Sequence, residues 1–271
     1  MPELPEVETT RRGIEPYVRN VKVTEVIVRR RDLRQPVSDD LSVIESHRIT
    51  GVSRRSKYLL LSIDDGSTLL IHLGMSGSLR VISPSDPWKT HDHVGITLAN
   101  GKQLRFHDPR RFGLVLRLTG DPMIHPLLEN LGPEPLGEEF TAARLQAACA
   151  KRSAAIKLVI MDAKVVVGVG NIYASEALFR AGILPRTPAK KLSKPRLAKL
   201  VAAIRDVLSD SIREGGTTLR DFLHSDGEPG YFKQRLFVYE RKGEPCRVCG
   251  TPIRQAVLGQ RSTYWCPKCQ K

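Results

Sequence analysis

Four of the five cysteines lie near the C-terminus in two pairs of equal spacing. The pairs are Cys246-x-x-Cys249 and Cys266-x-x-Cys269, with 16 residues between them. Zn²⁺ prefers four tetrahedral ligands, and two thiolates three positions apart on a tight turn supply two of them. Two disulfide bonds are the alternative, but nothing in the sequence indicates an oxidising compartment. The spacing predicts one structural zinc ion. Cys149, in an alanine-rich segment, is predicted to be a buried apolar residue.

The N-terminus offers a second candidate reactive group. Pro2 follows the initiator methionine, and a small second residue usually permits removal of that methionine. Removal exposes a secondary amine; α-amino groups have a pKa of about 8, against about 10.4 for lysine, so more of it is unprotonated and nucleophilic near neutral pH. Glu3 and Glu6 would bring two carboxylates near this amine, one for proton transfer and one for orientation. The alternative is a purely structural helix start, which favours both proline and glutamate.

The formal net charge of +14 is concentrated in the second half of the chain. Residues 1–135 hold 19 basic and 17 acidic side chains, residues 136–225 hold 15 and 8, and residues 226–271 hold 9 and 4. One explanation is a surface that is merely rich in lysine and arginine. The other is a phosphate-binding face, because neutralising phosphates releases counterions and supplies most non-specific affinity for nucleic acid.

Length and hydropathy exclude several classes of protein. No apolar run approaches the ~18 residues that a membrane span needs. The acidic, proline-rich start does not fit a signal peptide. A chain of 271 residues suggests about two domains, each able to bury its own core. We therefore expect a basic intracellular protein, a class whose members commonly bind nucleic acid.

The first 135 residues have the pattern of strands after one short helix. Proline at position 5 suits a first helical turn, and Val7, Ile14 and Val18 share one helical face. Asn100-Gly101 suits a tight turn between strands. The predicted strands cover residues 21–28, 58–61, 69–71, 94–98, 104–106 and 114–118.

Beyond residue 135 the apolar period becomes helical. Helices are predicted over 142–150, capped by Thr141, and over 154–162, 171–181 and 194–212, with Ser193 as a cap for the last. The segment 217–231 shows no clear period and is predicted to be a loop. The stretch between the two cysteine pairs is long enough for two short strands.

Motifs along the whole chain resemble one family. The chain is similar to the bacterial formamidopyrimidine-DNA glycosylases, bifunctional glycosylase/lyases that act on oxidised purines such as 8-oxoguanine. The resemblance rests on these motifs, in this order: Pro2-Glu3-Leu4-Pro5-Glu6-Val7-Glu8, Ser56-Lys57-Tyr58-Leu59, His72-Leu73-Gly74-Met75-Ser76-Gly77, Asp108-Pro109-Arg110-Arg111-Phe112-Gly113, Gly168-Val169-Gly170-Asn171-Ile172-Tyr173-Ala174, Gly215-Gly216-Thr217-Thr218-Leu219, Ser225-Asp226-Gly227, and the four cysteines with Gln260-Arg261.

The resemblance implies a multidomain α+β fold. It comprises an N-terminal β-sandwich with an N-terminal helix over 1–135, a helix–two-turn–helix DNA-binding domain over 136–225, and the lesion-loop end with a zinc-ribbon finger over 226–271. It implies base-excision repair of double-stranded DNA that holds oxidised bases or abasic sites. It further implies one structural zinc, no organic cofactor, no membrane, a monomer, and the cytoplasm of a bacterium in association with the nucleoid.

The resemblance also assigns roles to individual residues. Pro2 would form a Schiff base and Glu3 would transfer a proton, with Glu6 orienting the pair. Lys57 and Arg261 would hold phosphates and assist the β- and δ-eliminations. An enzyme that works on a base must extrude it from the stack, and Met75, Arg110 and Phe112 would fill the gap. The remaining DNA contacts implied are His91, Asn171 and a basic group of Lys151, Arg152 and Lys157.

Two other functions remain open from sequence. An enzyme of the endonuclease VIII type would share the chemistry but prefer oxidised pyrimidines; that branch typically has glycine where this chain has Leu4. A zinc-ribbon nucleic-acid binder without catalysis would need the basic half and the cysteines but no free Pro2 amine. Without the resemblance, Met75 and Phe112 would be assigned to core packing and Arg110 to the surface.

Overall fold

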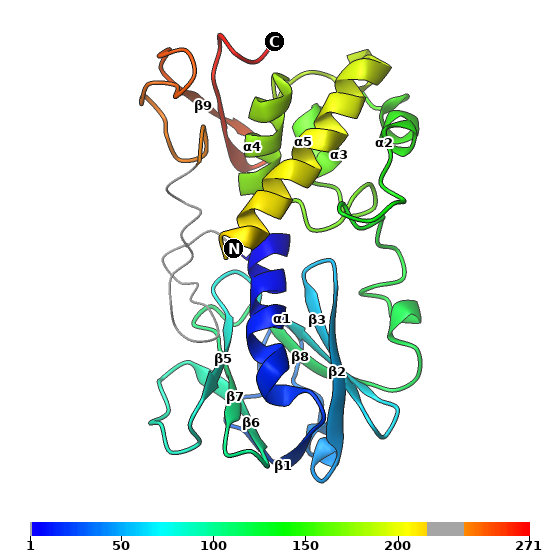
Figure 1. Cartoon of the computed structure of the whole chain (residues 1–271), viewed down its shortest axis with the longest axis vertical. Coiled ribbons are helices and arrows are strands. Elements are labelled where there is room, and N and C mark those ends of the chain that lie inside the picture. The colour runs from blue at the N-terminus through cyan, green and yellow to red at the C-terminus, as the bar shows by residue number, and fades with distance from the viewer. Residues whose placement is uncertain (1, 216–235) are drawn as a thin grey trace. The chain divides into compact units, whose positions relative to one another are not determined.

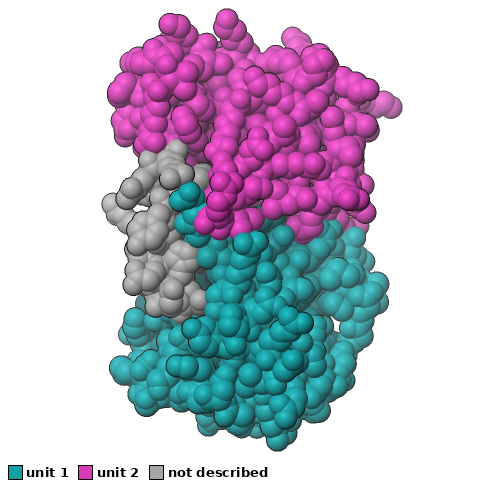
Figure 2. All heavy atoms as spheres, viewed as in Figure 1, with its two compact units in different colours: residues 1–129, 214–233 teal, residues 130–213, 234–271 magenta. Residues whose placement is uncertain are grey.

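The computed structural model describes residues 2–215 and 236–271 (Figure 1). Within the chain, two compact units are distinguished, one of residues 1–129 and 214–233 and the other of residues 130–213 and 234–271 (Figure 2). The loop predicted over 217–231 lies outside the described residues. The division into three domains at residues 135 and 225 stays a prediction. None of the described helices is long and apolar enough to cross a membrane.

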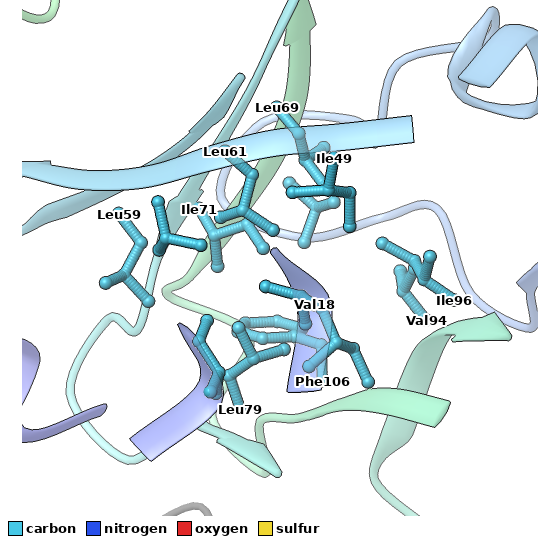
Figure 3. Close-up of a cluster of buried hydrophobic side chains, with 14 of the residues drawn as sticks. Val18, Ile49, Leu59, Leu61, Leu69, Ile71, Leu79, Val94, Ile96 and Phe106 are labelled. Atoms are coloured by element: carbon cyan, nitrogen blue, oxygen red, sulfur yellow. The ribbon is translucent and has the colours of Figure 1, made fainter. Parts of the chain in front are cut away.

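The first unit is built on eight antiparallel strands in the order β5-β7-β6-β1-β2-β3-β4-β8. Strand β1 belongs to two layers, because Val21 and Lys22 pair with β2 whereas Val23 to Val28 pair with β6. The layers enclose one apolar cluster, in which side chains of β3 and β4 face those of β5, β6 and β7 (Figure 3). This arrangement is the predicted β-sandwich. The strands are β1 (Val21–Val28), β2 (Arg48–Arg55), β3 (Tyr58–Ile63), β4 (Thr68–His72), β5 (Ser78–Ile82), β6 (Asp92–Leu98), β7 (Gln103–His107) and β8 (Leu114–Leu118).

The sequence predicted six of these strands and missed β2 and β5. Strand β2 buries only Ile49 and Val52, and the rest of it is polar or glycine, so it carries little apolar signal. The predicted turn at Asn100-Gly101 does join β6 to β7, with Gly101 at φ +76°. A glycine adopts this left-handed conformation without the steric cost that a side chain would add.

Helix α1 (Leu4–Val18) packs against the sandwich on its predicted face. Val7, Ile14 and Val18 are buried in the same cluster as the strands. Pro5 lies in the first turn, where its missing N–H would have no intrahelical partner. The sandwich core therefore fixes the helix whose first turn adjoins Pro2.

The second unit contains four α-helices among its described residues. They are α2 (Ala142–Cys149), α3 (Ile156–Ile160), α4 (Asn171–Ala181) and α5 (Lys194–Arg213). Short 3₁₀ turns are η1 (Leu41–Ile44) and η2 (Pro122–Ile124) in the first unit and η3 (Ala189–Lys191) in the second. The predicted apolar face of α5 is buried throughout, at Leu197, Leu200, Val201, Ile204, Leu208 and Ile212.

Local contacts set the ends of these helices. Thr141 caps α2 by accepting a hydrogen bond from the Arg144 N–H at 3.2 Å. Helix α4 ends at Gly182, whose φ of +68° is the left-handed conformation of a helix stop. Helix α3 begins two residues later than predicted because Ala155 forms a β-bridge with Pro188.

The C-terminal hairpin consists of β9 (Arg254–Leu258) and β10 (Arg261–Trp265). Its two-residue turn, Gly259-Gln260, has both φ angles positive, at 54° and 60°. Such a primed turn matches the twist of the strands and keeps Leu258 opposite Arg261. A Cβ on Gly259 would lie 2.6 Å from Leu158 of α3, so the turn packs directly on that helix.

A glycine substitution tests how tightly the first unit is packed. In Gly113→Ala the new Cβ would lie 2.5 Å from Phe106 Cζ and 2.7 Å from the His72 carbonyl oxygen. We expect a loss of about 2 kcal/mol or more in unfolding free energy. Urea denaturation measures it. Gly51→Ala is the control, because nothing lies within 4 Å of its Cβ position, and an equal loss in both variants would contradict the packing.

Candidate active site and nucleic-acid interface

The first turn of α1 buries two carboxylic acids beside Pro2. Glu3 is 2 % exposed and Glu6 is fully buried, and Pro2 is buried as well. The Glu3 N–H donates to Glu6 Oε2 at 2.8 Å. Glu6 therefore acts as the glutamate of a helix capping box, because it accepts a hydrogen bond from the N-cap N–H. The same hydrogen bond fixes the backbone next to Pro2. The structural and the chemical interpretations of these residues are thus compatible.

Lys57 lies in the two-residue turn between β2 and β3. Arg55 pairs with Tyr58 across this turn, and Ser56 adopts a left-handed φ of 55°. Arg54 connects the turn to helix α1, because its guanidinium donates to the Ser56 carbonyl at 2.7 Å and to Glu8 Oε2 at 3.3 Å. The half-buried Lys57 is therefore placed relative to the helix by a bridge through Arg54.

Glu8 holds that bridge as a carboxylate. Burial raises the pKa of Glu8, but hydrogen bonds from Arg11 and Arg12 and the charge of Arg54 outweigh it and leave the pKa below its usual value. Both Glu8 and Arg54 have side chains only 12 % exposed. A pair so shielded from solvent should contribute more to stability than an exposed surface ion pair, whose contribution is small.

His72 is a residue that the sequence reasoning did not single out. Its ring lies 4.8 Å from the ring of Tyr58, next to Lys57 in the chain, and its Nδ1 accepts a hydrogen bond from the Gly74 N–H at 3.0 Å. Burial and the charges of Lys57 and Arg34 lower the pKa of His72 to about 4. The imidazole is therefore neutral at physiological pH. Its position as the last residue of an apolar strand before a glycine-rich turn was the available signal.

The three predicted gap-filling residues come from two loops that touch each other. Met75 is half-buried in the β4–β5 loop, whereas Arg110 and Phe112 are exposed in the β7–β8 loop. The Arg110 guanidinium lies 5.0 Å from the centre of the Phe112 ring. A Cβ on Gly74 would lie 2.6 Å from the backbone of Phe112. Glycine is therefore required for the two loops to approach so closely.

Asp108 joins these loops from beneath. Its fully buried carboxylate accepts hydrogen bonds from Ser76 Oγ at 3.1 Å and from the Gly113 N–H at 2.8 Å. Its carbonyl oxygen also lies 2.7 Å from His93 Nε2. One carboxylate thus holds the loop of Met75 and the loop of Phe112 in a fixed relation.

His91 is exposed immediately before β6. Its ring lies 5.9 Å from His107 and 6.4 Å from His93. The next residue, Asp92, is buried and receives hydrogen bonds from Arg80 at 3.0 Å and from the Lys89 N–H at 2.9 Å, with His107 Nδ1 2.8 Å away. The Asp92 carboxylate, next to His91 in the chain, therefore has its hydrogen-bond partners within the protein.

Lys157 is not on the surface where a direct DNA contact was predicted. Its side chain is fully buried in the second unit. The ammonium donates to Asn171 Oδ1 at 2.6 Å, to Thr263 Oγ1 at 2.8 Å and to the Ser262 carbonyl at 3.1 Å. Asn171 Nδ2 donates to the same carbonyl at 3.0 Å. In the described structure Lys157 thus ties the start of α4 to the strand that begins at Arg261.

The other basic candidates of the second unit are more open to solvent. Arg261 is exposed beside the hairpin turn, and Lys151 is exposed after α2. Arg152 is partly exposed and donates to Asp162 Oδ2 at 2.9 Å. Asn171, at the first position of α4, is half-buried. The start of α4 and the hairpin turn thus carry polar groups in one connected network.

The four C-terminal cysteines form a metal-binding cluster. Their sulfur atoms all lie within 4.8 Å of one another, at 3.9 Å for Cys246–Cys269 and 3.4 Å for Cys249–Cys266. A disulfide needs about 2.05 Å, whereas tetrahedral Zn–S bonds of about 2.3 Å place the sulfurs about 3.8 Å apart. The N–H groups of Val248 and Cys269 also point at ligand sulfurs. The donor set fits zinc, and the disulfide alternative is wrong.

Comparisons with known proteins agree with this geometry. Three family models match in order: the formamidopyrimidine-DNA glycosylase N-terminal domain over residues 1–115, its H2TH domain over 131–223, and a zinc finger found in Fpg and IleRS over 243–271. The formamidopyrimidine-DNA glycosylase of Methylococcus capsulatus is 56% identical over 272 residues, covering 100% of both chains. The chain belongs to the formamidopyrimidine-DNA glycosylase family.

Solved structures lead to the same family. A Lactococcus lactis Fpg complex with abasic-site DNA matches at a TM-score of 0.92 and 32% identity, covering 99% of each chain. A complex of Lactococcus lactis Fpg with Fapy-dG DNA matches at a TM-score of 0.91 and 31% identity, covering 99% of this chain and 100% of that one. The protein is a DNA glycosylase of base-excision repair that holds one structural zinc ion. A binder without catalysis is therefore excluded.

Replacing one ribbon cysteine tests the zinc assignment. We expect Cys249→Ala to reduce bound zinc from one equivalent to near zero, because three thiolates do not complete the tetrahedron. Plasma emission spectrometry of the purified protein measures the metal. Cys149→Ala is the matched control: this fifth cysteine is buried outside the cluster, so the variant should keep its zinc. Full zinc in Cys249→Ala would contradict the assignment.

His72 predicts how stability depends on pH. Its pKa of about 4 in the folded protein lies below the ordinary 6.5, so between these values the unfolded chain binds a proton that the folded chain does not. Stability should fall as pH drops from 6.5 to 4, by up to about 3 kcal/mol. Urea denaturation of the native protein and of His72→Gln at pH 7.5 and 4.5 isolates this effect. A difference between the two proteins that is independent of pH would refute it.

Proposed function

We propose that this glycosylase removes oxidised purines, namely 8-oxoguanine and formamidopyrimidines, through a Schiff base on the Pro2 amine, and then cuts the strand by β- and δ-elimination. The observation that carries the proposal is the buried first turn of α1, in which Glu6 holds Glu3 through its N–H at 2.8 Å directly beside Pro2. An amine and a carboxylic acid are thus presented together by a rigid helix start.

The first step exchanges one C1′–N bond for another. The Pro2 nitrogen attacks C1′ of the damaged nucleotide, the bond from C1′ to the base breaks, and the base leaves as its protonated form. Glu3 transfers the proton, since it is the carboxylic acid adjacent to the nucleophile. The C1′–O4′ bond then breaks, the proton of the attacking amine passes to O4′, and the nitrogen lone pair forms the iminium ion, because a secondary amine gives that cation directly.

The iminium serves as an electron sink for two eliminations. Loss of the C2′ proton expels the 3′ phosphate, and loss of the C4′ proton then expels the 5′ phosphate. Lys57 and the neutral His72 lie together next to the turn of β2 and β3, and we assign them to the phosphates that flank the lesion. Arg261 and Asn171 have the same role in the second unit.

Met75, Arg110 and Phe112 are proposed to occupy the space that the extruded nucleotide leaves. Met75 and Phe112 replace base stacking, and Arg110 donates to the unpaired partner base. Insertion of such wedges requires a rigid support, which Asp108 supplies by joining their loops. His91 and Arg152 contact the DNA backbone in this proposal.

Lys157 acts in this proposal as a positioning residue rather than as a surface contact. Its ammonium fixes Asn171 and Ser262, the neighbour of Arg261. A buried cation without these oxygens would be costly. Both phosphate-binding groups of the second unit are therefore oriented by one ammonium group. The abasic-site and Fapy-dG complexes of the Lactococcus lactis relative support double-stranded DNA as the substrate. We place the enzyme, as a monomer, in the bacterial cytoplasm at the nucleoid.

Borohydride trapping tests the Schiff base. On duplex DNA with 8-oxoguanine opposite cytosine, we expect one covalent adduct on the peptide that begins at Pro2. Pro2→Gln retains the initiator methionine, because its second side chain is bulky, and so places no free amine at this position. Its cleavage rate should fall at least about a thousandfold, whereas DNA affinity, which depends on phosphate contacts and decreases with salt, should change much less.

Glu3→Gln separates the two chemical steps. This variant keeps the amine, so we expect trapping on DNA that already contains an abasic site, while release of 8-oxoguanine slows by about 10²–10⁴-fold. An adduct mapped to a lysine instead of Pro2 would overturn the proposed nucleophile. Preferential trapping on a thymine-glycol duplex would favour the endonuclease VIII type of specificity.

A further inference from the structure

A pocket of about 170 Å³ lies in the second unit between the segment after α4 and the zinc-ribbon hairpin. Its walls are mainly apolar and include Leu184 and Pro185 on one side and Val257, Leu258 and Trp265 on the other. An apolar cavity of about 150 Å³ holds one benzene ring. The pocket therefore has room for a single aromatic side chain.

The pocket is open to solvent. Val257, which lines it, is 72% exposed. The side chains of Ala256, Leu258 and Trp265 share one face of the hairpin and line the pocket, whereas that of Val257 lies on the opposite face. Among the residues that line the pocket, Thr263 has a role above, as an acceptor for the buried Lys157 ammonium; Val257, Leu184 and Trp265 have none.

Positive side chains lie at the pocket and on the segment that follows it, and they form no ion pair with other described residues. Arg186 lines the pocket, Lys190 and Lys191 follow it on the same segment, and Arg254 pairs in register with Trp265. All four side chains are exposed, and none forms an ion pair with another described residue. Several separated cations match an acidic chain better than a single small acid.

We propose that this pocket docks an acidic peptide segment of a partner protein, with one aromatic side chain inserted between Leu184 and Trp265 and the flanking carboxylates on Arg186 and Arg254. The aromatic side chain would bury apolar surface in the pocket, and the acidic residues would orient the peptide. In protein interfaces a few buried anchor residues contribute most of the binding energy. This interaction is independent of the chemistry at Pro2.

The test uses full-length zinc-loaded protein and a fluorescein-labelled peptide, Asp-Glu-Asp-Phe-Glu-Asp, followed by fluorescence anisotropy. We expect this peptide to bind at least tenfold more tightly than the same peptide with alanine in place of phenylalanine. Ala256→Phe fills the pocket from its wall and should abolish that preference. Arg186→Glu should weaken binding at least tenfold.

Matched controls separate the pocket from general effects. Val43→Phe and Arg144→Glu make the same kinds of change at exposed positions outside the pocket, and both should bind the peptide like the native protein. Ala256→Phe should bind lesion-free duplex DNA within twofold of the native protein, with unchanged zinc content.

Three results would overturn the proposal. Equal affinity for the phenylalanine-free peptide would show only attraction of a polyanion. Unchanged peptide binding by Ala256→Phe would place the contact elsewhere. A loss of duplex binding by Ala256→Phe as large as its loss of peptide binding would assign the pocket to the DNA interface.

Discussion

The hydrogen bond from the Glu3 N–H to the buried Glu6 carboxylate is the constraint on which the proposed chemistry depends. A chain terminus is normally the least ordered part of a domain, whereas the proposed mechanism requires the Pro2 amine to be held in a fixed direction. The fold solves this by making the terminus the first turn of a helix and burying that helix in the sandwich core through Val7, Ile14 and Val18. In the proposed mechanism, the position of the Pro2 amine therefore depends on the apolar packing of this helix.

Buried hydrogen-bonded side chains also position surface groups away from the N-terminus. Asp108 in the first unit and Lys157 in the second are fully buried ionisable side chains. Each forms hydrogen bonds with segments that are distant in sequence. A buried charged group is costly unless it is completely satisfied, so each one tolerates only a narrow range of geometries. The surface groups that the proposal brings to DNA, such as Phe112 and Asn171, are positioned from beneath by these hubs.

The proposed catalytic groups and the excess positive charge lie in different parts of the chain. The nearly balanced first half of the sequence holds the amine and the carboxylic acids, whereas the excess of positive charge lies in the helices and the zinc ribbon. Chemistry at an amine requires local control of one group, and affinity for DNA requires many phosphate contacts. The zinc ion supports DNA affinity in the proposed function by stabilising the ribbon, because the small ribbon has too few apolar residues to hold its hairpin without the metal.

Local patterns in the sequence predicted several elements correctly. The apolar faces of α1 and α5, the stop at Gly182, the turn at Asn100-Gly101 and the zinc cysteines all depend on residues close together in the chain. Three features depend on distant partners and were found only in the folded chain: the polar strand β2, the neutral His72 beside Lys57, and the burial of Lys157, which looked like a surface lysine. Burial and pairing of a charged side chain are set by segments that meet only in the folded chain, and no local pattern encodes them.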